Sequence, residues 1–266
     1  MLLRLHKTGW VVFLLLILVS CESPLEQRDD NHHLPEGMFP LEFASIDVAV
    51  LPSEMYSRIT EDRNNLSCYW SEGDRISIQI MGGNNDEEGV CTLDEYGNIR
   101  NHNLFWQTAS TSVIIGWYPH GTESINLTNQ RKELAYVLKS DPIKANYKSG
   151  PIRLRFKHQL AKVRIIVSGN MGWLLRAKLF IRAHTSCINR NGNFYPGDTK
   201  DYIEMRSIRS RQRIYEATVF PMTITEGEDI LQISVLYQQK RFKLDHKLTL
   251  EAGKMYSFEL AANWFD

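Results

Sequence analysis

The stretch "IRLRFKHQLAKVRIIVS", residues 152–168, alternates apolar and polar side chains over its whole length. Every second residue from 152 to 160 is apolar or histidine, and from 163 to 167 the apolar residues occupy the opposite parity. Alternation of this kind predicts strands with one buried face. Because a shift of one residue moves every side chain to the other face, the change of parity predicts a bulge or corner near Leu160 and Ala161. A strand that leaves one sheet and enters another needs such a break.

The same period of two recurs in most segments after residue 40. No long segment keeps the period of 3.6 that an amphipathic helix requires. Turn-forming residues such as Gly97-Asn98, Asn191-Gly192-Asn193 and Ala252-Gly253 separate the segments. Many short strands with frequent turns predict an all-β chain built as a sandwich or barrel. The alternating segments are residues 41–50, 75–80, 113–117, 215–219, 231–237, 242–250 and 256–260.

The composition limits the classes of protein to which the chain can belong. Its 266 residues carry 31 basic and 31 acidic side chains, so the formal net charge is zero and gives no electrostatic argument for a nucleic-acid partner. A hydrophobic content of 43% is typical of a packed globular protein. Apart from Cys21, the cysteines Cys68, Cys91 and Cys187 are odd in number and widely spaced, which speaks against a disulfide framework or a metal site. We expect mostly buried thiols, at most one disulfide, and no cofactor.

The N-terminus has the features of a secretory signal. A short basic lead precedes an apolar core over residues 9–19, which is shorter than the roughly 20 residues of a membrane-spanning helix. The core ends in "LVSC", residues 18–21, which resembles the lipobox of bacterial lipoproteins. That resemblance implies a lipoprotein signal peptide over residues 1–20, lipidation at Cys21 and a flexible tether over residues 21–37. An uncleaved signal anchor with an incidental cysteine is the alternative.

Four further motifs follow the lipobox in order: "YWSEGDRISIQI" (69–80), "IGWYPHG" (115–121), the stretch 152–168 quoted above, and "LTLEAGKMYSFELAAN" (248–263). Together they resemble the fimbrillin family of Gram-negative anaerobes. The resemblance covers most of residues 40–263. It implies an all-β chain of two transthyretin-like Greek-key β-sandwich domains in tandem, with a role in surface fimbriae and no enzymatic activity. The turn residues Gly150-Pro151 place the domain boundary to within about ten residues, giving domains over residues 38–150 and 151–266.

The fimbrillin resemblance also implies a route of assembly. In this family the lipidated precursor reaches the outer membrane, and an Arg-specific protease removes the tether with the first strand. The vacated groove then accepts a strand from the next subunit. Here the first strand is expected over residues 39–51, with residues 41–51 lying between other strands. The polar stretch that follows carries Arg58 and Arg63, the expected sites of proteolytic processing.

The function expected from the resemblance is that of a fimbrial subunit, or of an accessory or tip adhesin, on the cell surface. Stalk subunits continue with further strands where this sequence ends in "AANWFD" (261–266), so an accessory or tip role is expected. Expected partners are other fimbrial subunits, the outer membrane through the lipid anchor, and a glycan or protein on a host or bacterial surface. The alternative is a surface lipoprotein that does not polymerise and binds a glycan through exposed aromatic residues such as Trp106, Trp117 or Trp173.

No other motif nominates a catalytic or ligand-binding site. His158 has the inward parity of its strand and is expected to be a hydrogen-bonded core residue. The stretch "GGNNDEEG", residues 82–89, has acidic and amide groups without the spacing of a calcium loop, so a solvated hairpin tip is expected. Trp70 with Gly73-Asp74 is expected to be structural. The sequence has no nucleophile-elbow, zinc-protease or phosphate-loop motif.

Overall fold

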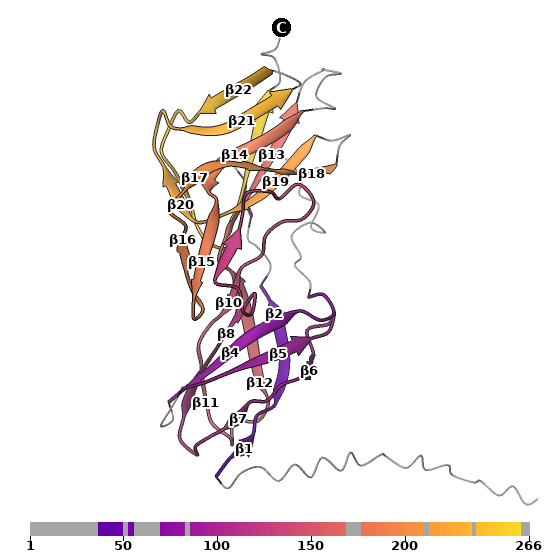
Figure 1. Ribbon diagram of the computed structural model, residues 1–266, viewed down its shortest axis with the longest axis vertical. Coiled ribbons are helices and arrows are strands. Elements are labelled where there is room, and N and C mark those ends of the chain that lie inside the picture. Colours follow the sequence, from indigo (N-terminus) through magenta and orange to yellow (C-terminus); the bar gives the residue numbers. More distant parts are fainter. Residues whose placement is uncertain are drawn as a thin grey trace, which may run out of the picture. The chain divides into compact units, whose positions relative to one another are not determined.

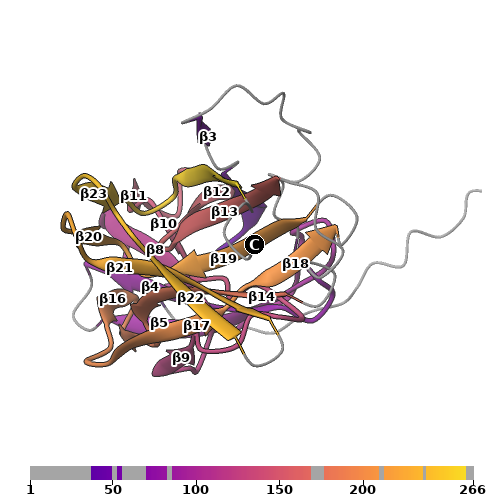
Figure 2. The same ribbon diagram turned by 90° about the horizontal axis from the view of Figure 1, so that it is seen from above.

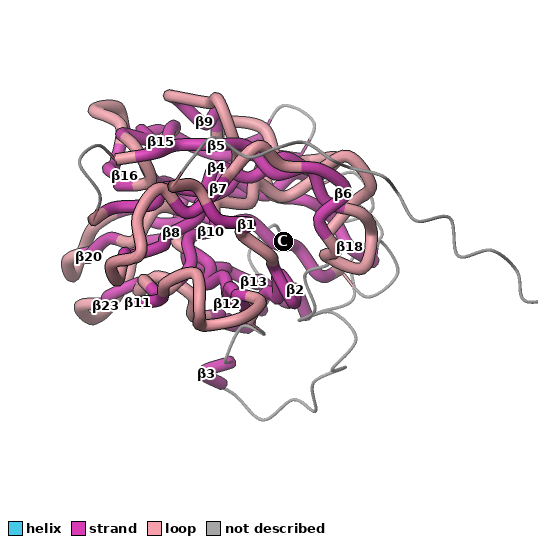
Figure 3. Tube along the Cα trace, turned by 90° about the horizontal axis from the view of Figure 1, so that it is seen from below, coloured by secondary structure: helices cyan, strands magenta, loops and turns pink. Residues whose placement is uncertain are grey.

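The described part of the chain is built from β-strands alone. The computed structural model describes residues 37–49, 53–55, 70–82, 86–168, 177–209, 213–235 and 238–261. Within these ranges every regular element is a strand, which confirms the all-β prediction (Figure 3). No helix in the same ranges could cross a membrane.

The first group of strands forms one large sheet and a small ladder (Figure 1). Neighbours in the large sheet run in the order β2-β12-β10-β8-β4-β5-β6, and β11 also pairs with β8. The strands are β2 (Phe43–Val48), β4 (Arg75–Met81), β5 (Glu87–Leu93), β6 (Ile99–Asn101), β8 (Ser112–Tyr118), β10 (Leu138–Ser140), β11 (Ile143–Ala145) and β12 (Ile152–His158). The ladder pairs β1 (Phe39–Pro40) with β7 (Phe105–Trp106).

The second group contains four sheets (Figure 2). The five-stranded sheet has the order β18 (Arg206–Arg209), β19 (Ile214–Val219), β13 (Ala161–Ser168), β24 (Met255–Ala261) and β3 (Ser53–Met55). The four-stranded sheet has the order β17 (Lys200–Glu204), β14 (Lys178–His184), β21 (Asp229–Val235) and β22 (Gln238–Lys243). The smaller sheets are β16 (Asn193–Pro196), β15 (Ser186–Arg190) and β9 (Ser124–Asn126), and the pair β20 (Met222–Ile224) and β23 (Leu248–Leu250).

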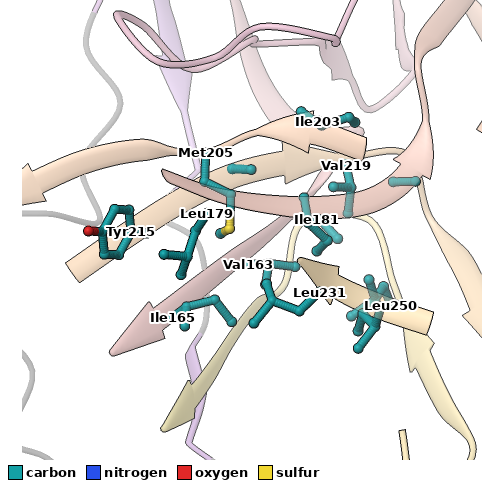
Figure 4. Close-up of a cluster of buried hydrophobic side chains, with 14 of the residues drawn as sticks. Val163, Ile165, Leu179, Ile181, Ile203, Met205, Tyr215, Val219, Leu231 and Leu250 are labelled. Atoms are coloured by element: carbon teal, nitrogen blue, oxygen red, sulfur yellow. The ribbon is translucent and has the colours of Figure 1, made fainter. Parts of the chain in front are cut away.

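Two separate clusters of buried side chains hold these groups together. One cluster lies on the inner face of the large sheet and includes Ile78, Ile114 and Phe156. The other lies between the five-stranded and four-stranded sheets, where side chains from β13, β14, β17, β19 and β21 meet (Figure 4). Its labelled members in Figure 4 are Val163, Ile165, Leu179, Ile181, Ile203, Met205, Tyr215, Val219, Leu231 and Leu250.

The stretch 152–168 connects the two groups. β12 pairs with β10 in the large sheet, and β13 pairs with β19 in the five-stranded sheet. The chain therefore changes sheet at Gln159 and Leu160, between the two parities, and the predicted break is confirmed. The change of sheet follows β12, within about ten residues of Gly150-Pro151, and β12 itself belongs to the first sheet. The division into two tandem domains stays a prediction.

Candidate functional site

The first strands of the chain form the candidate site, and β2 lies at the edge of the large sheet. Its one strand neighbour among the described strands is β12, to which it runs parallel (Figure 1). The ladder includes hydrogen bonds from the Ala49 N–H to the Phe156 carbonyl (2.7 Å) and from the Ile152 N–H to the Glu42 carbonyl (2.8 Å). The expectation that residues 41–51 lie between other strands is therefore wrong for the described part of that range.

A side chain and a turn occupy the second side of β2 in place of a strand. The Trp70 indole N–H donates to the Ile46 carbonyl at 2.9 Å. Gly97, in the turn between β5 and β6, also lies against this carbonyl, because a Cβ at Gly97 would come within 2.5 Å of the Ile46 oxygen. Gly97 has φ +81°, a conformation that side chains disfavour. The backbone polar group at this edge is thus satisfied without a second ladder.

β2 is anchored by apolar side chains that alternate with exposed ones. Leu41, just before the strand, and Ile46 belong to the first buried cluster, and Ile46 is 2% exposed. Phe43 and Val48 pack against the same cluster, whereas Ala44 is exposed. Complete burial of an Ile or Leu side chain is worth about 1.5–3 kcal/mol. Anchoring therefore depends on a few side chains and one ladder.

The same N-terminal segment reaches the second group of strands through β3. β3 pairs parallel with β24, with Ser53 opposite Met255 and Met55 opposite Ser257. The expected first strand over residues 39–51 is thus three strands, β1, β2 and β3, over residues 39–55. β2 and β3 lie at the edges of two different sheets, next to β12 and β24. We call residues 39–55 the leading segment.

The residues predicted to be modified lie outside the described part of the chain. Cys21, the predicted lipidation site, precedes residue 37, where the description begins. Arg58 and Arg63, the predicted processing sites, fall between β3 and Trp70. Arg58 follows the last residue of β3, Met55, by three positions in the sequence. All three assignments stay predictions.

The exposed-tryptophan version of the glycan site does not match the structure. Trp106 is 2% exposed and Trp117 is 3% exposed, while Trp173 lies outside the described residues. Trp117 points to the outer face of the large sheet, but the tip of the β15–β16 hairpin covers it. A Cβ at Gly192 in that tip would lie 2.7 Å from the indole. The large exposed aromatic residues of the described chain are Tyr96 and Tyr195.

His158 is buried at the end of β12, and its environment is only partly as predicted. It is 6% exposed, yet its Nε2 atom has no hydrogen-bond partner among the described residues. Burial, together with the nearby Lys162 ammonium group, lowers the pKa of His158 to about 4. The imidazole is therefore neutral at ordinary pH, and its protonation is unfavourable in the folded chain.

A buried ion cluster at the start of β13 was not predicted from the sequence. Glu216 on β19 is 1% exposed and contacts the Lys162 ammonium group at 2.7 Å and the Arg164 guanidinium group at 2.6 Å. In the alternating pattern Lys162 and Arg164 occupy the polar positions, where solvent-exposed side chains are expected. Their burial depends on tertiary packing that no local pattern reports. No group of three metal-ligating side chains occurs in the described ranges.

The comparison of the sequence with protein families gives a match over most of the chain. A family model for fimbrillin-like proteins matches residues 57–263. The chain belongs to the fimbrillin-like family. The match to the family model confirms the resemblance seen in the four motifs. The matched range begins one residue before the predicted processing site Arg58. No curated protein sequence matches this fimbrillin-like chain significantly.

Three of the solved structures similar to this fimbrillin-like chain come from species of Bacteroides. A proposed cell adhesion protein from Bacteroides uniformis has a TM-score of 0.57 at 16% identity, covering 73% of this chain and 88% of that one. A proposed cell adhesion protein from Bacteroides thetaiotaomicron has a TM-score of 0.52 at 21% identity, with coverage of 83% and 92%. A third, from Bacteroides ovatus, has a TM-score of 0.54 at 12% identity, with coverage of 82% and 92%. At these identities the comparison supports a shared fold.

Proposed function

We propose that this fimbrillin-like chain is a subunit or adhesin of surface fimbriae, made as a lipid-anchored precursor and assembled by strand exchange. The observation that carries the proposal is the edge position of β2, which one parallel ladder and a few buried side chains hold on β12. Membership of the fimbrillin-like family and the similarity to proposed cell adhesion proteins support a role at the cell surface. The two buried clusters support tandem transthyretin-like sandwich domains.

Cleavage after Arg58 or Arg63 would separate the leading segment from the rest of the chain. Departure of β2 and β3 would leave β12 and β24 each with an unpaired edge, since each then keeps one strand neighbour in its sheet. Leu154 and Phe156 on β12, which lie opposite Ile46 and Val48 of β2, belong to the first buried cluster. A row of unpaired backbone groups beside exposed apolar pockets is a template for a strand from another chain.

The lipid anchor at Cys21 would hold the precursor on the outer membrane until cleavage. Acyl chains contribute about 0.8 kcal/mol of membrane affinity per buried methylene, so several chains together give stable attachment. Cleavage at either arginine would separate the anchored N-terminus from the body of the protein. In this proposal a single proteolytic event both releases the subunit and opens its assembly edge.

Arg-specific proteolysis of the full-length chain in detergent tests the proposal. N-terminal sequencing should give a product beginning at Ile59 or Asn64, and size-exclusion chromatography with light scattering should show oligomers after cleavage. Replacing both processing arginines, Arg58→Gln and Arg63→Gln, should prevent both effects, while Arg100→Gln on β6 serves as the control. If the cleaved chain stays monomeric, strand exchange is wrong and the alternative of a non-polymerising surface lipoprotein takes its place.

A further inference from the structure

The outer face of the large sheet carries a row of cations on β12. Arg153, Arg155 and Lys157 occupy alternate positions and are exposed, whereas Leu154 and Phe156 between them are buried in the first cluster. Successive outward side chains on a strand are about 6.8 Å apart, which is twice the rise of about 3.4 Å per residue. The three cations therefore form a straight row of fixed spacing on a rigid strand.

Two more cations lie beside this row on the same face. Lys139 on β10 is directly opposite Lys157 on β12 and also opposite Trp117 on β8, which places it on the outer face. Lys144 on β11 is opposite Val113, an outward residue of β8. We call Lys139, Lys144, Arg153, Arg155 and Lys157 the cationic face.

The five cations outnumber the carboxylates beside them. Asp47 on β2 is exposed and directly opposite Arg155, without an ion pair between the two side chains. Lys157 pairs with Asp141 at 2.7 Å, but both side chains are more than half exposed, so the pair is weak. Lys139 donates to the neutral Asn193 amide oxygen at 2.9 Å. Arg153, Arg155 and Lys144 make no ion pair with any described residue. Lys139 and Lys157 are like charges directly opposite each other on neighbouring strands, and such a pair destabilises a sheet.

The geometry of the cationic face selects among anionic ligands. The face is a sheet surface whose backbone N–H groups point along the sheet into the ladders, so it offers no cradle for a single phosphate. Neighbouring strands of the face are about 4.8 Å apart, and outward side chains repeat about every 6.8 Å along each strand. This spacing suits an extended polymer with regularly repeated charge. Trp117, the aromatic ring next to Lys139, is covered by the hairpin tip, so no ring there is open to stack on a neutral sugar.

We propose that the cationic face binds an acidic polysaccharide, a polymer of uronic or sulfated sugars. The inference rests on the proposed function only in placing the chain at a cell surface, where such polymers occur. Binding uses the outer side chains of β10, β11 and β12, whereas strand exchange uses the edge and the inner face of β12. The two properties are separable by mutation.

The test measures binding of the full-length chain in detergent to alginate, a polyuronate, by isothermal titration calorimetry. Neutral dextran of similar length is the reference ligand. The variant Arg153→Gln/Arg155→Gln should bind alginate about tenfold more weakly or worse, since ionic contacts of this kind add up over a polymer. The control Lys243→Gln/Lys247→Gln removes the same charge from exposed positions at and just after β22 and should bind as the parent does. Far-ultraviolet circular dichroism and thermal melting show whether each variant is folded.

Several outcomes would overturn the inference. Equal loss of alginate affinity in both double variants would mean that overall charge, not the cationic face, binds the polymer. Dextran binding as tight as alginate binding would mean that charge is irrelevant. Tighter binding to double-stranded DNA, or to the soluble phosphorylated headgroup of an anionic lipid, would assign the face to a nucleic acid or a membrane. None of these results affects cleavage-dependent oligomerisation, so failure here is distinguishable from failure of the proposed function.

Discussion

The substitution Ile46→Ala should detach β2 locally while the rest of the chain stays folded. Ile46 is 2% exposed and is the most buried side chain of β2 itself. Truncation of a buried Ile to Ala costs about 2–5 kcal/mol, and an edge strand that can relax belongs toward the lower part of this range. We therefore expect a loss of about 2.8 kcal/mol in the free energy that holds β2 on β12, which corresponds to about 100-fold in the docking equilibrium.

Amide hydrogen exchange measures this loss at single residues. The Ala49 N–H, just after β2, donates to the Phe156 carbonyl on β12, and the Ile152 N–H, at the start of β12, donates to the Glu42 carbonyl just before β2. The protection of both amides should fall about 100-fold. The Lys162 N–H, which donates to the Lys254 carbonyl in the five-stranded sheet, should keep its protection. The control Ala44→Ser changes an exposed side chain of the same strand and should leave all three amides as in the parent. Equal loss of protection at Lys162 would refute local detachment, and no loss at Ala49 would refute the anchoring role of Ile46.

Three further predictions concern packing and charge. Burial lowers the pKa of His158 in the folded chain to about 4, whereas the value in the unfolded chain is about 6.5, so between these values only the unfolded chain binds this proton. The free energy of unfolding should therefore fall by about 3 kcal/mol as the pH drops from 6.5 to 4. Urea titration of the parent and of His158→Gln should show this decrease only in the parent. Glu216→Ala should cost about 3–5 kcal/mol in the free energy of unfolding, because it removes the buried carboxylate that the Arg164 guanidinium group and the Lys162 ammonium group both contact. Urea titration beside the exposed control Glu251→Ala measures the loss, and a loss below about 1 kcal/mol would contradict the burial. Gly97→Ala should raise the exchange of the Ala49 amide, because the added Cβ would come within 2.5 Å of the Ile46 carbonyl and displace β2, whereas Gly121→Ala, with a similar positive φ and open space, should not.

The strands were predictable from the sequence because alternation reports the face that each side chain occupies. In the stretch 152–168 the parity change marked the point where the chain passes from one sheet to another, and the structure has its break at Gln159 and Leu160. The pairing partners were less predictable. A period of two says which side chains are buried but not which strand lies alongside, and this is why β2 was expected between two strands.

The burial of side chains by segments that are distant in the sequence was not predicted. Trp117 alternates as an outward residue of β8, and a hairpin tip more than seventy positions later in the chain buries it through Gly192. Trp70 was expected to serve in packing. Its indole N–H in addition donates a hydrogen bond to the Ile46 carbonyl, on the side of β2 that faces away from β12. Contacts of this kind depend on the tertiary arrangement, and local patterns carry no record of them.

Binding of a synthetic peptide copied from the leading segment, residues 39–55, tests the central claim most directly. After Arg-specific cleavage, the β12 and β24 edges should be free to take back this peptide, and its binding should compete with oligomer formation. A peptide carrying Ile46→Asp should fail in both respects, because it would bury an unpaired carboxylate in the first cluster. Fluorescence anisotropy of the labelled peptide, read beside light scattering of the oligomers, should show tight binding of the native peptide and dispersal of the oligomers. A cleaved chain that ignores the native peptide, or binds it while its oligomers persist, would contradict assembly through the edge that β2 occupies.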